Sequence, residues 1–183
     1  SGLYRMVNRN KRSIVLNLKK PGAVDVVKQL IANVDVVLEQ FRPGVMDRLG
    51  IGYEVLKQVN PRLVYCAISS FGQDNEMSAK PGHDINFVAL AGLSHHLGRP
   101  DTGPIPLNAL IGDVAGGTWG AVAGILAALI ARGRTGVGQM VDISMTDGAL
   151  LMNAMAAMMA LSSGEDLGAG QGWLNGGGAY DYY

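Results

Sequence analysis

Short apolar runs recur along the chain with little alternation between apolar and polar positions. Four of them, at residues 13–18, 34–39, 62–69 and 139–144, are rich in Val, Ile and Leu. Strands buried on both faces of a sheet have this composition, whereas strands with one face in water alternate. The pattern therefore predicts four buried strands.

Segments between these runs repeat their apolar residues at helical spacing. The predicted helices cover residues 21–33, 45–49, 53–59, 83–97, 113–132 and 145–162. Strands that alternate with helices are typical of a layered α/β domain with a mostly parallel sheet. We therefore predict the α/β class.

The segment 114–131 raises the question of a membrane span. It is uncharged and mostly apolar over 18 residues, close to the ~20 apolar residues that a spanning helix needs. Four glycines interrupt it, Asp113 precedes it, and it lies within the alternating α/β pattern. We expect a helix packed inside a domain or at a subunit interface, and no membrane partner.

The composition fits a globular protein with a core, because 48% of the residues are hydrophobic and 16% are charged. Fifteen basic and fifteen acidic residues balance, so the basic excess of nucleic-acid binders is absent. The single cysteine, Cys66, lies in an apolar run and is expected to be a buried strand thiol. One cysteine and three histidines without zinc-ligand spacing predict no metal site.

Basic residues follow two of the predicted strands. Lys19 and Lys20 follow the first strand, and Arg42 follows the second, with Arg48 six residues further on. Because ligands of parallel α/β sheets bind beyond the carboxyl ends of the strands, these cations suit a phosphorylated ligand. Solvated surface charges are the alternative, and spacing alone favours them.

Two candidate acid/base groups stand at predicted helix starts. His83 precedes Asp84, where the helix dipole favours a neutral imidazole that accepts protons. Asp113 opens the long apolar helix, where Gly116 and Gly117 leave room for a ligand and free amides suit an oxyanion. Helix capping is the alternative for both sites.

Other titratable residues are weaker candidates. They are His95, His96, Asp142, Asp147 and Asp181. We interpret the two histidines as packing or surface residues, and Asp147 as the start of a helix.

Several collinear motifs together resemble one family. They are Asn8 to Lys19, Gln40 to Val45, Arg48 to Gly50, Ser69 to Gln73 and Thr135 to Gln139. In this order they resemble the large domain of family III CoA-transferases (CaiB/BaiF type) and alpha-methylacyl-CoA racemases. The resemblance implies a Rossmann-like domain over residues 1–183, with a first strand and helix before it and a second, smaller domain after it. It also implies an interlocked homodimer.

The resemblance further implies roles for individual residues. Asp113 matches the shared active-site carboxylate, and Gly82-His83-Asp84-Ile85-Asn86 matches the racemase histidine motif. Lys19, Arg42 and Arg48 match positions that contact coenzyme A. No cofactor is then required, because coenzyme A enters as part of the substrate.

The presence of His83 favours racemisation of 2-methylacyl-CoA thioesters, with His83 and Asp113 as the acid/base pair. The enolate oxygen is expected on amides at the Asp113 helix start. CoA transfer through a covalent Asp113 intermediate is the alternative, and an inactive fragment that binds CoA or a partner is a further one. We expect a cytoplasmic location, with the peroxisome or mitochondrion as alternatives in a eukaryote.

Overall fold

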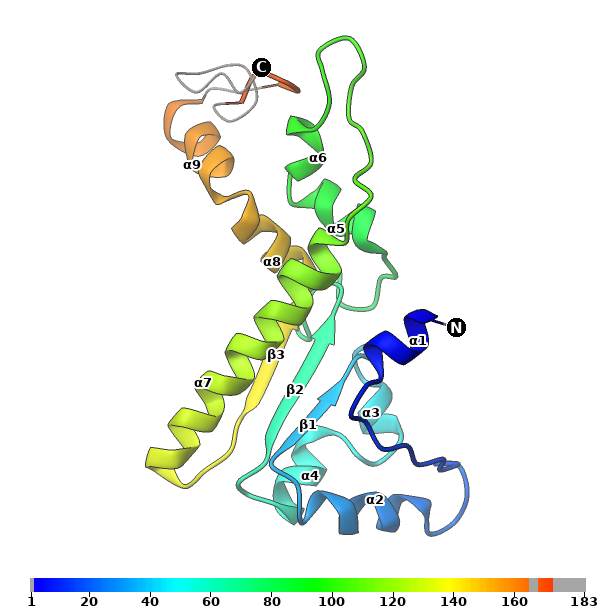
Figure 1. Ribbon diagram of the computed structural model, residues 1–183. Helices are drawn as coiled ribbons and strands as arrows, with labels where there is room; N and C mark the ends of the chain where they lie inside the picture. Colours follow the sequence, from blue (N-terminus) through cyan, green and yellow to red (C-terminus); the bar gives the residue numbers. More distant parts are fainter. Residues whose placement is uncertain (1, 165–167, 173–183) are drawn as a thin grey trace.

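The computed structural model describes residues 2–164 and 168–172. The sheet that these residues form contains β1 (Val36–Glu39), β2 (Val64–Ser69) and β3 (Met140–Ser144), in that order. Both pairings are parallel, with Val36 opposite Val64 and Tyr65 opposite Met140. The carboxyl ends of all three strands therefore meet at one edge (Figure 1). The predicted α/β class with a parallel sheet is confirmed.

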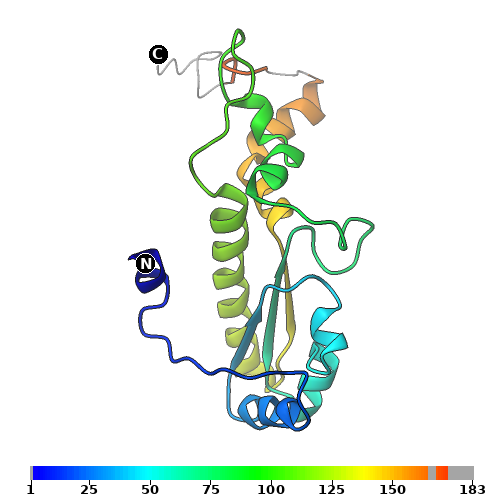
Figure 2. The same ribbon diagram turned by 90° about the vertical axis from the view of Figure 1, so that its right-hand side faces the viewer.

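Helices cover both faces and the carboxyl edge of this sheet. The helices of the described residues are α1 (Gly2–Val7), which stands apart from the sheet, α2 (Ala23–Ile31), α3 (Val45–Arg48), α4 (Tyr53–Val59), α5 (Asp84–Leu90), α6 (Leu93–His96), the π-helical segment η1 (Ile111–Thr118), α7 (Trp119–Thr135), α8 (Met145–Met152) and α9 (Ala154–Ser163). Figure 2 shows α7 on one face of the sheet and α3 and α4 on the other, with α2 beneath the amino ends of the strands. Helices α5, α6, α8 and α9 lie beyond the carboxyl ends of the strands (Figure 1).

The central strand β2 separates two apolar clusters. Tyr65 and Ala67 pack with Leu56 toward α2 and α4, while Cys66 and Ile68 pack toward α7. Successive side chains of a strand point to opposite faces, so one short strand supplies both cores. Every residue of β2 is buried, whereas the edge strands β1 and β3 are only partly buried. Among the described strands, burial on both faces therefore holds for β2 alone.

The predicted strand at residues 13–18 is wrong. This segment is extended but pairs with no strand of the described sheet. Ile14 is 66% exposed and Val15 is 94% exposed. An apolar run becomes a strand only when a neighbouring backbone pairs with it, and none does here. The sequence pattern also does not predict α1, none of whose residues is buried.

Two predicted helices are each broken, and the breaks lie against one another. Gly92, with φ of 77°, separates α5 from α6, and Asn153 separates α8 from α9. The buried Asn153 amide donates a hydrogen bond to the Ala91 carbonyl over 2.9 Å. A Cβ at position 92 would lie 3.0 Å from Asn153 Nδ2, so glycine permits this approach.

The predicted long helix begins earlier than expected, as η1, and continues as α7. Gly124 lets α7 lie directly on β3, because a Cβ there would be 2.6 Å from Val141 Cγ1. The opposite side of α7 exposes Trp119, Leu126 and Ile130. By length and composition alone, Ile111–Thr135 passes the test for a membrane-spanning helix, a test that core helices of soluble proteins also pass.

Candidate active site

A cavity of about 240 Å³ lies at the carboxyl edge of the sheet, and we call it the strand-end cavity. Loops after β1 and β2 and the first residue of α8 line it: Gln40, Phe41, Arg42, Pro43, Ile68, Ser69, Ser70, Ser78, Lys80, Pro81, Gly82, His83 and Met145. This is the position where ligands of parallel α/β sheets bind.

Arg42 and Lys80 bring two cations to the strand-end cavity from different loops. The turn at Arg42 is fixed because Glu39 Oε2 accepts a 2.6 Å hydrogen bond from the Phe41 amide. Among the described residues, neither cation has a hydrogen-bonded or ion-paired side-chain partner. Sequence reasoning missed Lys80, although its place directly before Pro81-Gly82-His83 is a usable signal.

Lys19, Lys20 and Arg48 do not line this cavity. The two lysines lie in a turn before α2 and do not follow a strand. Arg48 ends α3, where its Nη1 atom lies beside Gly44. The structure thus groups Arg42 with Lys80, while coenzyme A contacts by Lys19 and Arg48 stay a prediction.

A second cavity, of about 570 Å³, adjoins the first at His83, and we call it the apolar cavity. Its lining is mostly aliphatic: His83, Asp84, Ile85, Val88, Ala89, Ser94, Leu97, Pro104, Ile105, Pro106, Leu107, Ala109, Leu110 and Asp113. No Lys or Arg stands among the described residues of this lining. The cavity therefore suits an apolar group better than an anionic one.

His83 and Asp113 both line the apolar cavity, so the structure brings the two predicted acid/base residues together. His83 is the N-cap of α5, and its amide donates to Asn86 Oδ1 over 3.0 Å. Burial raises the pKa of Asp113 above its ordinary value, the Asp84 charge raises it further, and His83 lowers it. A raised carboxyl pKa suits a group that both accepts and donates protons.

The expected space for a ligand beside Gly116 and Gly117 is wrong, and two amides at the Asp113 helix start already have hydrogen-bond partners. The Asp113 amide donates to Asp84 Oδ1 over 2.8 Å, and the Val114 amide donates to the Leu110 carbonyl over 3.2 Å. These two amides are therefore already occupied, and an oxyanion contact with another amide of this helix start stays a prediction. Helix α8 fills the space beside Gly116 and Gly117, where added Cβ atoms would lie 2.8 Å and 2.9 Å from Met145 atoms. That space receives a helix and no ligand.

The structure also shows where two of the weaker titratable candidates lie. Asp142 accepts a 2.9 Å hydrogen bond from the Gln73 amide, and Asp147 is exposed on α8.

Burial raises the pKa of the Cys66 thiol to about 11, which makes it inert. In the described part of the chain, no group of three His, Cys, Asp or Glu side chains is placed to hold a metal ion. Asp181 lies outside the described residues.

Comparison with known proteins decides the family. Residues 1–183 match the family described as CoA-transferase family III. The chain belongs to CoA-transferase family III. Within this family, alpha-methylacyl-CoA racemase from Homo sapiens is 41% identical over 172 residues, which cover 93% of this chain and 45% of the relative.

Other relatives in CoA-transferase family III have different names. Acetyl-CoA:oxalate CoA-transferase from Acetobacter aceti is also 41% identical, over 163 residues covering 88% of this chain and 42% of the relative. The crystal structure of a CaiB/BaiF family protein from Brucella suis superposes with a TM-score of 0.82 at 34% identity, covering 87% of this chain and 42% of that one. The chain spans less than half the length of these relatives. The family therefore includes both racemases and CoA-transferases.

Proposed function

We propose that the full protein moves the α-proton of acyl-CoA thioesters with an apolar, 2-methyl-branched acyl chain, and so racemises them. One observation carries the proposal: the apolar cavity meets the strand-end cavity at His83, and Asp113 stands in the same lining. An acyl chain in the apolar cavity and coenzyme A in the strand-end cavity would place the thioester beside both residues.

The lining of the apolar cavity supports an apolar acyl group. A free carboxylate, such as that of a dicarboxylic acid, needs a cation or several hydrogen-bond donors when it leaves water. The cavity offers aliphatic side chains, two carboxylates and no Lys or Arg. Repulsion from the Asp84 and Asp113 carboxylates would further disfavour a free carboxylate on the acyl group.

In the proposed reaction, His83 or Asp113 takes the proton from the α-carbon. The electron pair of that C–H bond moves toward the carbonyl, and the thioester oxygen becomes an enolate oxygen. The other residue then gives a proton to the opposite face of the α-carbon. Since the Asp113 and Val114 amides are occupied, a different donor must hold the enolate oxygen.

Coenzyme A serves as the handle of the substrate and would extend over the strand-end cavity. Arg42 and Lys80 are the cations that line this cavity and lack a protein partner among the described residues. They would pair with phosphate oxygens. Lys19 and Arg48 are further proposed contacts, outside the cavity lining.

CoA transfer is the second candidate, and the identity of 41% to an acetyl-CoA:oxalate CoA-transferase favours it. Here the Asp113 carboxylate attacks the thioester carbon, the carbon–sulfur bond breaks, and the CoA thiolate leaves. The thiolate then attacks the Asp113 carbonyl of the mixed anhydride, which releases the donor carboxylate and leaves CoA on Asp113 as a thioester. The acceptor carboxylate attacks this thioester and displaces the CoA thiolate, which then takes the acceptor's acyl group and frees the Asp113 carboxylate. This reaction does not use His83.

The proposed homodimer draws support from the exposed apolar side of α7, which carries Trp119, Leu126 and Ile130. We keep the cytoplasm as the proposed location.

The deciding experiment measures α-proton exchange in deuterium oxide by the full-length protein with 2-methylacyl-CoA and no acceptor acid. We expect deuterium at the α-carbon, with loss of exchange in His83→Ala and in Asp113→Ala. CoA transfer to an added carboxylic acid that depends on Asp113 but not on His83 would instead establish the transferase. Neither activity in the full-length protein would leave only a binding role.

A further inference from the structure

The Asp84 side chain links the two helix starts that carry His83 and Asp113. Its Oδ1 atom accepts the 2.8 Å hydrogen bond from the Asp113 amide, across 29 positions of sequence. Asp84 is itself the first residue of α5, directly after His83. A single carboxylate therefore fixes where Asp113 lies relative to His83.

Close packing at Gly112 holds the start of η1 against α5. A Cβ at Gly112 would lie 3.3 Å from Asp84 Oδ1 and 3.0 Å from Phe87 Cβ. Because Phe87 is fully buried, it has little freedom to move away. Glycine at position 112 is thus needed for η1 to begin against α5.

We propose that Asp84 is a positioning residue that holds the Asp113 backbone in place and sets the pH range over which Asp113 exchanges protons. It does so by a hydrogen bond to the Asp113 amide and by the negative charge beside the Asp113 carboxyl group. The proposal rests on the proposed role of Asp113 in proton transfer.

The charges around Asp113 support the electrostatic part of this role. The elements packed against η1 are α5, α7, α8 and β3. Their charged residues besides Asp84 are Arg132 and Arg134 at the far end of α7, Asp147 and Asp142. Apart from burial, the charges that shift the pKa of Asp113 are those of Asp84, which raises it, and His83, which lowers it. Asp84 therefore opposes ionisation of Asp113, as a neighbouring like charge does.

Two substitutions separate the hydrogen bond from the charge. Asp84→Asn keeps an oxygen that accepts from the Asp113 amide but removes the negative charge. The pKa of Asp113 should then fall, so the part of the pH–rate profile that reports Asp113 should move to lower pH with little loss at the optimum. Asp84→Ala removes both, so the profile should move in the same direction and misplacement of Asp113 should also slow exchange by about 10²-fold at the optimum.

The experiment uses the full-length protein, with Asp147→Asn as the matched control because Asp147 is an exposed carboxylate on α8. Three quantities are measured: the pH profile of α-proton exchange, hydrogen exchange of residues 110–118 by mass spectrometry, and the pH dependence of carbodiimide labelling at Asp113. Labelling requires the protonated carboxyl group, so it reports Asp113 without catalysis.

We expect Asp84→Asn to lower the pH of the labelling midpoint, and Asp84→Ala to lose protection at residues 110–118, while the control does neither. An unmoved midpoint in Asp84→Asn, or full protection and full rate in Asp84→Ala, would overturn the proposal. If the wild-type protein exchanges no α-proton, the proposed function fails, but labelling and protection still decide the role of Asp84.

Discussion

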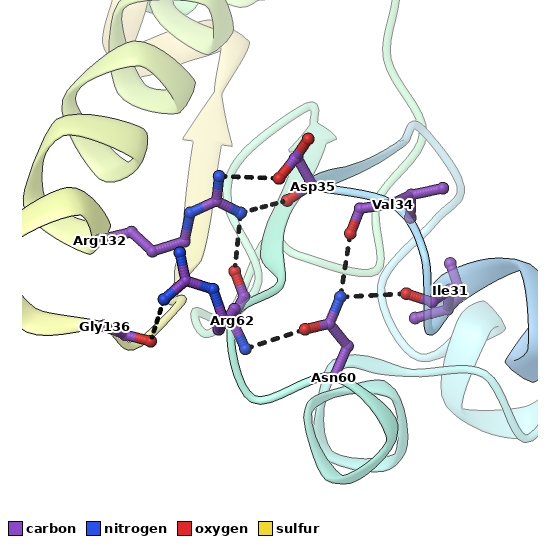
Figure 3. Close-up of polar contacts among 7 residues, drawn as sticks. All are labelled: Ile31, Val34, Asp35, Asn60, Arg62, Arg132 and Gly136. Carbon is purple, nitrogen blue, oxygen red and sulfur yellow. Dashed lines mark hydrogen bonds and ion pairs between the residues drawn. The ribbon is translucent and has the colours of Figure 1, made fainter.

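The two ends of the sheet are built in opposite ways. At the amino end, the Arg132 guanidinium donates to the Arg62 carbonyl over 3.1 Å and to Asp35 Oδ1 over 2.8 Å. Asn60 donates to the Ile31 and Val34 carbonyls, and Arg62 donates to the Gly136 carbonyl. Figure 3 shows these contacts joining the end of α7, the starts of β1 and β2, and the end of α2. The carboxyl end instead holds the strand-end cavity, where Arg42 and Lys80 lack such partners among the described residues.

This difference indicates that the residues that stabilise the domain lie at the amino end of the sheet, and that the residues suited to bind a ligand lie at its carboxyl end. At the amino end, the arginine side chains donate hydrogen bonds to backbone carbonyls and thereby join elements that are distant in sequence. Cations at the carboxyl end remain available for a ligand. Substitutions at the amino end should therefore change stability and leave activity intact, and substitutions at the carboxyl end should do the reverse.

The largest expected effect is at the carboxyl end, in Asp113→Asn. The variant keeps the backbone amide that donates to Asp84 but loses the carboxyl group that we propose exchanges protons. We expect α-proton exchange to fall by about 10²–10⁴-fold, with an unchanged midpoint of thermal unfolding. A large loss of thermal stability would contradict the division between the two ends. Asp147→Asn is the control.

At the amino end, Arg132→Leu should lower the free energy of unfolding by about 2 kcal/mol, because it strands carbonyl groups that the guanidinium satisfies. The Arg132 side chain is only 13% exposed, whereas Asp35 is 77% exposed, so the ion pair itself contributes little. Urea unfolding measures the change, and activity per folded molecule should stay constant. Arg134→Leu, an exposed neighbour, should change neither.

At the strand-end cavity, Arg42→Gln and Lys80→Gln should each raise the KM for the CoA thioester by about tenfold, since each would lose one pairing with phosphate. The unfolding midpoint should stay the same. The wild-type KM should also rise with salt, and less so in the variants. Lys57→Gln is the control, because Lys57 lies on α4 beside Tyr53 and pairs with Glu54. An equal rise in KM in Lys57→Gln would contradict the proposal that Arg42 and Lys80 pair with phosphate.

The smallest effect concerns Cys66, which lies between the two ends in β2. Burial, with the charges of Glu39 and Asp142, raises the pKa of this thiol to about 11. Alkylation needs the thiolate, so the folded protein should not react with iodoacetamide near pH 8. Reaction should begin only where denaturant unfolds the chain, as mass spectrometry would show. Rapid labelling of the native protein would mean that β2 opens readily.

Much of the fold follows from local pattern. The strands near residues 36, 64 and 140 and helices α2, α3, α4 and α7 lie close to where apolar spacing predicts them. The prediction of a strand at residues 13–18 is wrong because an apolar pattern indicates a preference for burial but not the presence of a partner strand. The breaks at Gly92 and Asn153 depend on a contact between distant residues, so neither helix shows its break by itself.

The sequence by itself determined the α/β class, because periodicity and turn residues act over a few neighbouring positions. It also offered His83, Asp113 and Arg42 as candidates, and the family resemblance gave them roles. Only the tertiary structure decided that Lys80 joins Arg42 and that Asp84 holds the Asp113 amide. It also decided that the cavity beside His83 is apolar and that Gly116 faces a helix. These facts depend on how separate loops and helices converge at the carboxyl edge of the sheet, and the path of the chain in space sets that convergence.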